Sequence, residues 1–409
     1  MALVSIDNAR GFVLSSCRRL EPVRTFIVEA VGHVLAEPVR SSEPVPPFTN
    51  SSMDGYAVRS GDVEDAPARL RVIGALMAGY DPGALVVGEG EAARIMTGAV
   101  LPAGADAVCM VEHTRSEEGF VIIEEAVGPG TNVRNAGGDI AAGEEVFAAG
   151  AQLSAAHIGV LASLGMEQVL VYPRPRVGVV STGDELTSGP GPLEVGKIRD
   201  SNRPALLAQL KADGFVAVDL GHAADEPDAL AQILQEAAQE CDALLTSGGV
   251  SVGDRDIVRA VLEKLGGQHA RWLQVAVRPG KPFAFSTFPP AATPVFGLPG
   301  NPVSALVSYE VFARPSLRLM AGHENLDRPR LAARAAVDML RQPDGRLHLV
   351  RVQAVASADG ALHVRPSGGQ SSHQLHALAS ANALALLPDG EGVAAGEIVE
   401  VMVLDAETL

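Results

Sequence analysis

A stretch of small and acidic residues at 246–256, TSGGVSVGDRD, has the composition of a phosphate-binding loop. It follows a short apolar run that predicts a buried strand, and it precedes a segment, 257–262, whose apolar spacing predicts a helix. Backbone N–H groups at the start of such a helix, together with the positive end of its dipole, bind anions. Gly248 and Gly249 would let the backbone approach a ligand closely, and Asp256 would lie beside it. A tight strand-to-helix turn without a ligand has the same sequence, so this loop alone leaves both interpretations open.

Other loops of the same kind lie in the same part of the chain. From about residue 174 the sequence alternates between apolar runs, polar loops and helical segments. This alternation predicts a parallel sheet with right-handed crossovers. Ligands of such sheets bind beyond the carboxyl ends of the strands, and loops on a rigid scaffold commonly carry function. We therefore expect a shared site where the loops rich in glycine, proline and carboxylates meet. These loops are 182–185, Asp225, 247–249 and 299–302.

Composition sets limits on the class of protein. At 409 residues the chain is too long for one ordinary core, which predicts about two to four domains. Its formal net charge of −17 argues against nonspecific binding to nucleic acid or a membrane surface, so an anionic ligand requires a local basic pocket. Cys17, Cys109 and Cys241 are too far apart for a disulfide framework or a metal site, and the N-terminal residues lack a signal-peptide pattern. The most apolar long stretch, 155–172, is interrupted by polar residues, so we expect a soluble, cytoplasmic protein.

The remaining segments predict further modules. Residues 6–20 and 23–36 have apolar side chains at helical spacing. Short apolar runs between glycines and prolines over 46–139 are typical of a small all-β module, and Ser154 is placed to cap a helix. After about residue 325 short strands replace the helical rhythm. The predicted domains are a helical linker (1–45 plus 140–173), a β module (46–139), an α/β domain (174–324) and a C-terminal β module (325–409).

Seven loop motifs run along the chain: PPFTNSSMDGYAVR (46–59), RIMTGAVLPAGADAV (94–108), STGDEL (181–186), DSNRP (200–204), SGGVSVGDRD (247–256), PGKPFAF (279–285) and GLPGNPVS (297–304). Each motif alone is a weak signal. Together, and in this order, they resemble the MoeA family of molybdopterin molybdenumtransferases, a family also seen as the E domain of gephyrin-like proteins. The resemblance covers essentially the whole chain.

This resemblance implies a fold and a reaction. The fold has a central doubly wound α/β domain, similar to the molybdopterin-binding proteins MoaB and MogA, with a helical linker, an inserted β module and a C-terminal β-barrel-like module. The reaction is the last step of molybdenum cofactor assembly: molybdate is placed on the dithiolene of adenylylated molybdopterin, and AMP is released with the help of Mg²⁺. The family also implies a homodimer, whose site lies between the α/β and C-terminal domains and receives the MDGYA-bearing module of the other subunit. Molybdopterin adenylyltransferase and molybdoenzyme acceptors would be its partners.

The reactants of that step are all negative, so the site requires cations, N–H donors and a metal. Lys281 in VRPGKPF is the candidate to meet the pterin phosphate or molybdate. Arg278 stands where the family usually has a second lysine, and it exchanges a point donor for a planar fork. Mg²⁺ takes one or two carboxylates plus substrate oxygens and water, which suits scattered loop acids. The candidate catalytic residues are Asp54, Glu185, Asp256 and Lys281, and the candidate Mg²⁺ ligands are Glu185, Asp225 and Asp256.

The substrate-binding candidates come from the same motifs and from the C-terminal module. Arg351 and Ser372 align with the family's basic and hydroxyl positions for molybdate, although Ser371 is an equally suitable donor. His373 is interpreted as a structural residue or as one that supports the residues in contact with the substrate. It is not interpreted as a metal ligand, because no second His or Cys lies at ligand spacing. The full set is Thr97, Asp139, Thr182, Gly183, Asp184, Asp200, Asn202, Ser247, Gly248, Gly249, Ser251, Arg278, Pro299, Asn301, Pro302, Arg351 and Ser372.

Several of these positions have structural alternatives. Asp184 and Asp225 could instead cap a helix or form an Asx-turn, and the two prolines of 299–302 suit a first helical turn in any protein. The chain also departs from the family: Thr49 stands where many members have Asp, and the loop 133–140 carries a single cation where others have a basic run. These departures concern the amount that this loop adds to substrate binding.

Two alternative functions remain at this point. The α/β motifs alone also fit a molybdopterin adenylyltransferase or a nucleotide-pyrophosphate hydrolase, although those enzymes lack the paired MDGYA and C-terminal modules. A noncatalytic scaffold that binds a partner peptide, as the gephyrin E domain does, is the second alternative. The sequence does not distinguish molybdate from tungstate, because the two oxyanions have nearly the same size and charge.

Overall fold

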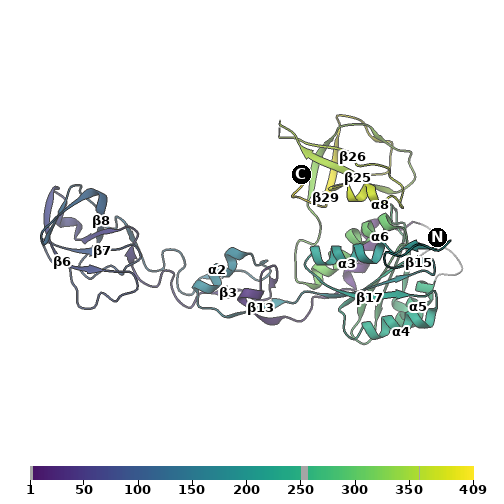
Figure 1. Ribbon diagram of the computed structural model, residues 1–409, viewed down its shortest axis with the longest axis horizontal. Coiled ribbons are helices and arrows are strands. Elements are labelled where there is room, and N and C mark those ends of the chain that lie inside the picture. Colours follow the sequence, from purple (N-terminus) through teal and green to yellow (C-terminus); the bar gives the residue numbers. More distant parts are fainter. Residues whose placement is uncertain (1–2, 250–256, 359) are drawn as a thin grey trace. The chain divides into compact units, whose positions relative to one another are not determined.

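A computed structural model describes residues 3–249, 257–358 and 360–409 (Figure 1). The chain forms two compact units. The large unit comprises Met1–Arg24, Gly32–Ala36 and Leu170–Leu409, and the small unit comprises Thr25–Val31 and Glu37–Val169. The predicted α/β and C-terminal modules therefore belong to the large unit, and the predicted 46–139 module belongs to the small unit.

A six-stranded sheet forms the centre of the large unit. Its strand order is β17-β14-β18-β22-β21-β19, and the first four strands run parallel, as the sequence predicted. The prediction of a parallel sheet is wrong at one edge, where β21 runs antiparallel to both of its neighbours, β22 and β19. The four residues 289–292 between β21 and β22 allow only a hairpin, because a parallel crossover needs a much longer connection. The strands are β17 (Val216–Ala223), β14 (Arg176–Thr182), β18 (Ala243–Ser247), β22 (Thr293–Leu298), β21 (Pro282–Phe288) and β19 (Arg271–Gln274).

Helices cover both faces of this sheet, which confirms the doubly wound α/β fold (Figure 1). Each face has its own apolar core: Val177 and Val179 of β14 point to one, and Val180 points to the other, as the alternation of a strand requires. The first core is covered by α1 (Ile6–Ser15), α3 (Asn202–Ala212), α6 (Pro302–Ser308) and α7 (Arg314–Met320), and the second by α4 (Pro227–Ala237) and α5 (Ile257–Gly266).

A closed five-stranded barrel forms the C-terminal part of the large unit, as the β-barrel-like prediction required. Closure comes from the pairing of β25 with β27 in addition to the order β25-β26-β23-β29-β27. One further strand joins the two parts of the unit: β20 (Val277–Arg278) pairs in parallel with β25, so that Arg278 lies opposite His348. The barrel strands are β23 (Arg330–Ala335), β25 (Leu347–Ala356), β26 (Leu362–Pro366), β27 (Ala383–Leu387) and β29 (Ile398–Val403); α8 (Leu375–Ala379) and the pair β24 (Met339–Leu340) and β28 (Gly392–Val393) accompany them.

The small unit is built mainly from strands, as predicted for 46–139. Its six-stranded sheet has the order β8-β5-β7-β6-β10-β9. The helix α2 (Ala155–Ser163) begins with a capping box. The Ser154 hydroxyl accepts the backbone N–H of His157, and the His157 ring accepts the backbone N–H of Ser154, so the predicted cap is confirmed. The strands are β3 (Val39–Arg40), β4 (Asn50–Ser51), β5 (Gly55–Val58), β6 (Ala68–Leu76), β7 (Glu91–Ile95), β8 (Ala107–Met110), β9 (Thr114–Glu117), β10 (Phe120–Ile123), β11 (Val133–Arg134) and β12 (Glu145–Phe147).

The predicted helix over 23–36 is wrong. The segment contains the strand β1 (Val23–Phe26), a single 3-10 turn over Ile27–Glu29 and the strand β2 (Val34–Leu35). Valine, threonine and isoleucine dominate it, and their branched side chains favour extended backbone over a helix. Gly32, with φ +84°, places a left-handed residue where a helix would have to continue. The remaining elements are β13 (Gln168–Tyr172), β15 (Leu186–Thr187), β16 (Ile198–Arg199), 3-10 turns at Ser60–Asp62, Val111–His113 and Gly267–His269, and a π-helix at Tyr309–Ala313.

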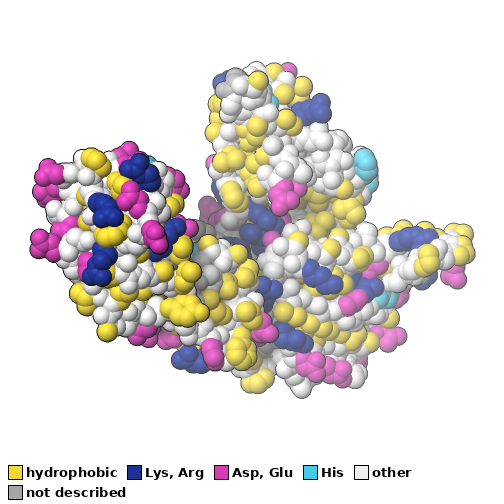
Figure 2. Space-filling model, turned by 60° about the vertical axis from the view of Figure 1, so that its left-hand side comes forward, with side chains coloured by type: hydrophobic (Ala, Val, Ile, Leu, Met, Phe, Trp, Pro, Cys, Tyr) yellow, Lys and Arg dark blue, Asp and Glu magenta, His cyan; other side chains and the backbone are white. Residues whose placement is uncertain are grey.

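The distribution of charged side chains on the surface agrees with the acidic composition of the chain. Figure 2 shows acidic and basic side chains interspersed over the visible face, without a broad basic surface. Cys17, Cys109 and Cys241 are buried free thiols, and burial raises the pKa of Cys17 to about 11 and that of Cys109 to about 12. Among the residues that the structure describes, no helix is both long and apolar enough to cross a bilayer.

Buried ion pairs fasten the end of α3 to the helices that follow the sheet. The guanidinium of Arg314 donates to Asp213 at 3.0 Å, and that of Arg328 donates to both Asp213 (2.9 Å) and Glu310 (2.9 Å). The hydroxyl of Tyr309 adds a hydrogen bond to Asp213 at 2.8 Å. The Asp213 side chain is only 4% exposed, so these donors offset the cost of burying its carboxylate.

We expect His323, which follows α7, to make the stability of the large unit depend on pH. Burial, with Arg318 and Arg314 nearby, lowers the pKa of His323 from 6.5 to about 4. The unfolded chain therefore takes up this proton more readily, so stability should be full above about pH 6.5 and should fall as the pH drops towards 4. Because the side chain is partly exposed, we expect a loss of about 1–2 kcal/mol. Urea unfolding of the wild type and of His323→Gln at several pH values measures it: the variant should lose less stability over this range, and equal slopes would contradict the assignment.

Candidate active site

A cleft of about 610 Å³ lies at the carboxyl ends of β14, β18 and β22, and we name it the strand-end cleft. It forms where the parallel topology brings successive loops to one edge of the sheet, as the sequence predicted. The structure brings together here most of the predicted α/β residues. They are Thr182, Gly183, Glu185, Asp200, Asn202, Asp225, Ser247, Gly248, Gly249, Pro299, Asn301 and Pro302. Ser251 and Asp256 lie outside the described residues.

Hydrogen bonds hold the loops of the cleft in place. The side-chain amide of Asn202 donates to the hydroxyl of Ser247 (2.8 Å) and to the carbonyl of Gly300 (2.7 Å), so it fastens three loops together. The Asp200 carboxylate accepts hydrogen bonds from Ser181 (2.6 Å) and from the backbone and guanidinium of Arg203 (3.1 and 3.0 Å). Asp200 thus accepts hydrogen bonds from the first turn of α3, whose N-cap is Ser201, a role that its predicted place in substrate binding did not include.

Asp184 and Asp225 hold two loops against each other. The N–H of Asp225 donates to the Asp184 carboxylate at 3.1 Å, and the N–H of Asp184 donates to the Asp225 carboxylate at 3.3 Å. The N-cap of α4 is Glu226 rather than Asp225. Asp184 is not among the residues that line the cleft, whereas Asp225 is.

The acidic side of the cleft carries Glu185 and Asp225. In the described part of the chain no three His, Cys, Asp or Glu side chains come close enough to hold a metal ion by themselves. Two carboxylates completed by substrate oxygens and water are a normal Mg²⁺ site, so the donor set of the cleft fits this ion. The buried hydroxyl of Thr182, which also lines the cleft, has no hydrogen-bond partner among the described residues.

Glycines shape the floor of the cleft. Gly183 has φ +137°, and a Cβ there would lie 2.4 Å from the Glu185 carboxylate. Gly248 has φ +101°, and a Cβ there would lie 2.5 Å from the backbone carbonyl oxygen of Thr182. The second contact involves main chain, which cannot move aside without disturbing β14.

Replacing Gly248 with alanine should therefore cost about 1–3 kcal/mol of folding free energy, because it combines left-handed strain with a backbone clash. Gly191→Ala is the matched control, since a Cβ at Gly191 has no heavy atom within 4 Å. Chemical denaturation of the two variants measures the difference. Equal stabilities would show that the loop relaxes without penalty.

A second cavity of about 440 Å³, which we name the basic cavity, adjoins the strand-end cleft. The two share Pro282, Asn301 and His373 as wall residues. Arg278, the last residue of β20, and Lys281, in the loop between β20 and β21, are both exposed and line the basic cavity. The opposite wall comes from the barrel and consists of Arg346, Gln370, Ser371, Ser372 and His373.

The barrel wall of the basic cavity is tied directly to the α/β domain. The N–H of Val303, in the first turn of α6, donates to the carbonyl of Ser372 at 3.1 Å. Ser371 and Ser372 both line the cavity, so the structure leaves both as hydroxyl donors. His373 lies at the junction of the two cavities and belongs to the walls of both.

Arg351, predicted to bind substrate, lies beneath the cavity wall rather than in it. Its side chain is 0% exposed, and its guanidinium donates to the carbonyls of Gly369 (2.7 Å) and Ser371 (3.3 Å). The Gln370 side chain accepts a hydrogen bond from the Arg351 N–H at 2.9 Å. Nε and Nη1 of Arg351 have no hydrogen-bond partner among the described residues, and burial lowers its pKa. In this structure Arg351 supports the 369–371 loop, and direct contact with a substrate stays a prediction.

The predicted site residues of the small unit include one close pair. The carboxylate of Asp54 accepts hydrogen bonds from both the N–H and the hydroxyl of Thr97, each at 2.7 Å. These bonds lower the pKa of Asp54. Asp139 is exposed and lies next to the bridge between Val45 and Ile140.

Sequence reasoning missed several residues of the site. Arg346 and Ser304 line the basic cavity, but Arg346 lies outside all seven motifs and Ser304 is the last residue of one of them. Gln370 stands inside the stretch GGQSSH (368–373), next to the predicted hydroxyl donors Ser371 and Ser372. The pairing of β20 with β25 brings Arg346 to the site, and no local pattern reports such a pairing.

Comparison with known proteins agrees with this arrangement. Three family models match consecutive parts of the chain: the MoeA N-terminal region (domain I and II) over residues 4–165, a probable molybdopterin binding domain over 178–319, and the MoeA C-terminal region (domain IV) over 332–404.

Individual relatives match over nearly their whole length. A molybdopterin molybdenumtransferase from a Nostoc species is 41% identical over 369 residues, which are 88% of this chain and 84% of the relative. The enzyme of that name from Haemophilus influenzae is 38% identical over 404 residues, 98% of each chain. The crystal structure of a molybdopterin biosynthesis moeA protein from Pyrococcus horikoshii matches with a TM-score of 0.82 at 30% identity, and it covers 99% of this chain and 100% of its own. The chain therefore belongs to the MoeA family of molybdopterin molybdenumtransferases.

Proposed function

We propose that this protein catalyses the last step of molybdenum cofactor biosynthesis, in which molybdate is inserted into adenylylated molybdopterin and AMP is released. The relatives named molybdopterin molybdenumtransferase support the reaction class. The observation that carries the proposal is the contact between an acidic cleft and a basic cavity, which share Pro282, Asn301 and His373.

The presence of an acidic cleft beside a basic cavity suits the charges of the two substrates and of Mg²⁺. Molybdate is a tetrahedral dianion, and the basic cavity offers it the ammonium of Lys281 and the guanidinium of Arg278, with Ser372 as a hydroxyl donor. The phosphates of the adenylylated pterin would lie along the strand-end cleft, whose walls include Ser247, Gly248 and Gly249. Shared walls would hold the two reacting groups close to each other, which lowers the entropy cost of bringing them together.

Mg²⁺ fits the acidic side of this arrangement. Glu185 and Asp225 would hold the ion, and Asp256 completes the proposed set. The bound ion would neutralise phosphate charge and polarise the phosphoanhydride. Without it, the carboxylates of the cleft would repel the pyrophosphate of the substrate.

The test is AMP release from adenylylated molybdopterin by the purified full-length protein, with molybdate and Mg²⁺ each present or absent. We expect release only when both are present, together with a product that activates a molybdenum-dependent apoenzyme. Tight binding of an intact substrate would indicate a carrier or scaffold instead. Formation of adenylylated molybdopterin from ATP and molybdopterin would indicate the adenylyltransferase.

The proposal retains two expectations that the family resemblance supports. The first is a homodimer, in which Asp54 and Thr97 of one subunit would complete the site of the other. The second is a cytoplasmic location with molybdopterin adenylyltransferase and molybdoenzymes as partners. Size-exclusion chromatography with light scattering tests the first, and an Asp54→Asn protein mixed with a Lys281→Met protein should regain activity if subunits exchange and share sites.

A further inference from the structure

The exposed side chain of His222, near the end of β17, reaches a loop of the strand-end cleft. Its Nε2 lies 2.9 Å from the carbonyl oxygen of Gly183, the first residue after β14. A carbonyl oxygen only accepts hydrogen bonds, so Nε2 carries the hydrogen and donates it. His222 belongs to none of the seven motifs and is not among the residues that line the cleft. Any effect of His222 on a ligand in the cleft therefore passes through Gly183.

A bulge in β17 brings His222 to this position. In the pairing of β14 with β17, Val179 lies opposite Asp219. Two residues further along β14, Ser181 lies opposite His222, so β17 contains one extra residue at this point. Gly221, with φ +80°, supplies the left-handed backbone of the bulge. The extra residue changes the face of the sheet to which the following side chains of β17 point.

The second apolar core of the sheet shows the effect of this bulge. Val218 and Leu220 pack against that core, and Ala223 is buried in it. In a regular strand, residues 218, 220 and 222 would share one face. The extra residue gives Ala223 the place in the core that residue 222 would otherwise take. His222 is thereby exposed, and its ring reaches Gly183 instead.

The carbonyl of Gly183 closes a tight turn around Glu185. The N–H of Leu186 donates to the same carbonyl at 3.0 Å, so Asp184 and Glu185 are the two central residues of a β-turn. The Glu185 carboxylate folds back over Gly183, since a Cβ on that glycine would lie 2.4 Å from it. His222 thus holds the residue against which the Glu185 carboxylate rests.

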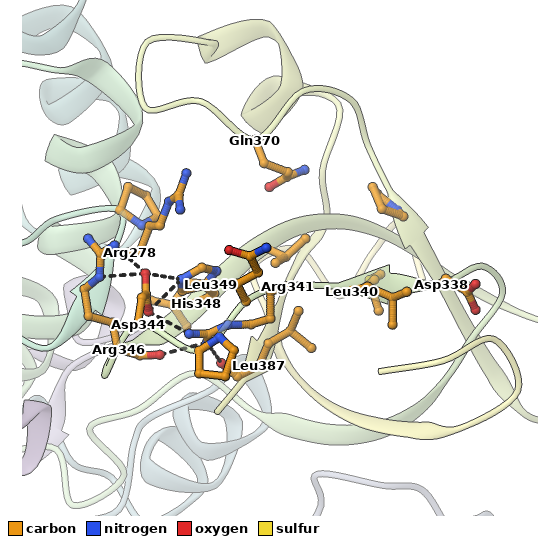
Figure 3. A pocket seen from close by; sticks show the side chains of 16 residues that line it. Arg278, Asp338, Leu340, Arg341, Asp344, Arg346, His348, Leu349, Gln370 and Leu387 are labelled. Atoms are coloured by element: carbon orange, nitrogen blue, oxygen red, sulfur yellow. Dashed lines mark hydrogen bonds and ion pairs between the residues drawn. The ribbon is translucent and has the colours of Figure 1, made fainter. Parts of the chain in front are cut away.

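The Glu185 carboxylate forms no hydrogen bond or ion pair with any described residue, so it is available to a cation. A histidine that donates directly to a carboxylate has the opposite effect in the C-terminal barrel. There the ring of His348 donates to Asp344, whose carboxylate also accepts two guanidinium groups and is saturated with donors (Figure 3). Because His222 donates to backbone, it fixes the turn and leaves the carboxylate of Glu185 open.

We propose that His222 is a positioning residue for the Mg²⁺ site of the proposed reaction. It fixes the turn so that the carboxylate of Glu185 can share the ion with Asp225. The reciprocal hydrogen bonds between Asp184 and Asp225 join the two loops, and the bond from His222 fastens the first loop to β17. Residues that orient a metal ligand without touching the ion commonly set the affinity of a site. The inference rests on the proposed function for the identity of the ion.

Titration of the full-length protein with Mn²⁺, followed by the electron paramagnetic resonance signal of the free ion, tests the proposal without turnover. We expect a Mn²⁺ site that is lost in Glu185→Gln. His222→Leu should weaken this site about tenfold, the lower end of the loss on removing a residue that orients a metal ligand. His222→Gln should restore most of the affinity, because its amide N–H replaces the N–H of Nε2, whereas the shorter His222→Asn should not. In the Glu185→Gln background, His222→Leu should have no further effect.

His269→Leu is the matched control. His269 is exposed and precedes β19, the strand at the other edge of the sheet from β17. Equal losses of Mn²⁺ affinity in His222→Leu and His269→Leu would overturn the proposal, and so would an equal loss in His222→Gln and His222→Leu. A wild-type protein without a Mn²⁺ site that depends on Glu185 would overturn it as well.

The AMP-release assay separates positioning of the ion from a general defect. His222→Leu should raise the Mg²⁺ concentration for half-maximal rate about tenfold while kcat at saturating Mg²⁺ stays within about twofold of the wild type. A lower kcat with an unchanged Mg²⁺ dependence would indicate a purely structural role and overturn the proposal. Mn²⁺ binding as predicted, without AMP release by the wild type, would count against the proposed function alone.

Discussion

Replacing Lys281 with methionine should lower kcat/KM for molybdate about a hundredfold to a thousandfold, the loss typical for removal of one preorganised charge donor from an active site. Lys281 is exposed into the basic cavity, and no described residue forms an ion pair with it. Its charge is therefore available to a substrate rather than used to hold the fold. The measurement is the rate of AMP release as a function of molybdate concentration.

Lys211→Met is the matched control for this prediction. Lys211 is exposed on α3, so its replacement changes the net charge equally at a distance from the proposed site. Lys281→Arg should recover part of the rate because it restores the charge with a different donor geometry. A Lys281→Met protein as active as the Lys211→Met protein would remove Lys281 from the proposed mechanism.

Replacing Asp213 with alanine should destabilise the large unit by about 3–5 kcal/mol, the usual cost of breaking a buried ion pair from one side. The change leaves the guanidinium groups of Arg314 and Arg328 in a buried place with Glu310 as their remaining acidic partner. Removal of the carboxylate also takes the acceptor from the hydroxyl of Tyr309. Urea denaturation monitored by circular dichroism measures the loss.

Glu263→Ala serves as the control for the buried network. Glu263 pairs with Arg259 on the exposed side of α5, with side chains 57% and 49% exposed, so its loss should cost about 1 kcal/mol or less. If the Asp213 and Glu263 variants unfolded at the same urea concentration, the buried network would contribute no more than a surface pair does.

The strand-end cleft could be predicted from the sequence because the topology of the parallel sheet alone brings its residues together. Once strands and helices alternate, the carboxyl ends of the parallel strands must meet at one edge, and the loops with glycine and carboxylate necessarily follow. Thr182, Ser247 and Asn301 are far apart in the chain, yet the first two end strands of the same sheet and Asn301 lies three residues after the end of a third. Their meeting required no knowledge of side-chain contacts.

Only one wall of the basic cavity could be predicted from the sequence. Lys281 belongs to a motif, but its opposite wall depends on how the barrel docks, and that follows from the pairing of β20 with β25. Arg346 and Gln370 reach the site through this long-range pairing. Arg351 shows the reverse case: its sequence position matched the family pattern, whereas its burial beneath Gly369 and Ser371 could be seen only in the fold.

The errors in secondary structure have a common origin. Apolar residues over 23–36 fall at helical spacing, but in so short a segment the same positions also suit two strands separated by a turn. At the sheet edge, the antiparallel direction of β21 followed from the short connection to β22, which a count of the residues between the two apolar runs could have detected. In both places glycine and loop length, rather than the period of the apolar pattern, determine the structure.

The two paired residues of β20 also determine how this protein can be divided. Val277 and Arg278 are the point at which the α/β domain donates a strand to the barrel, and the Leu347 N–H adds a hydrogen bond to the carbonyl of Ala276 at 2.9 Å. A chain cut near residue 325 would lose His373 from the wall of the strand-end cleft, and it would lose the strand that pairs with β20 beside the cationic loop. The first apolar core of the sheet also includes Leu349, Leu384 and Met402 of the barrel, so we expect that neither piece alone would keep the walls of the basic cavity.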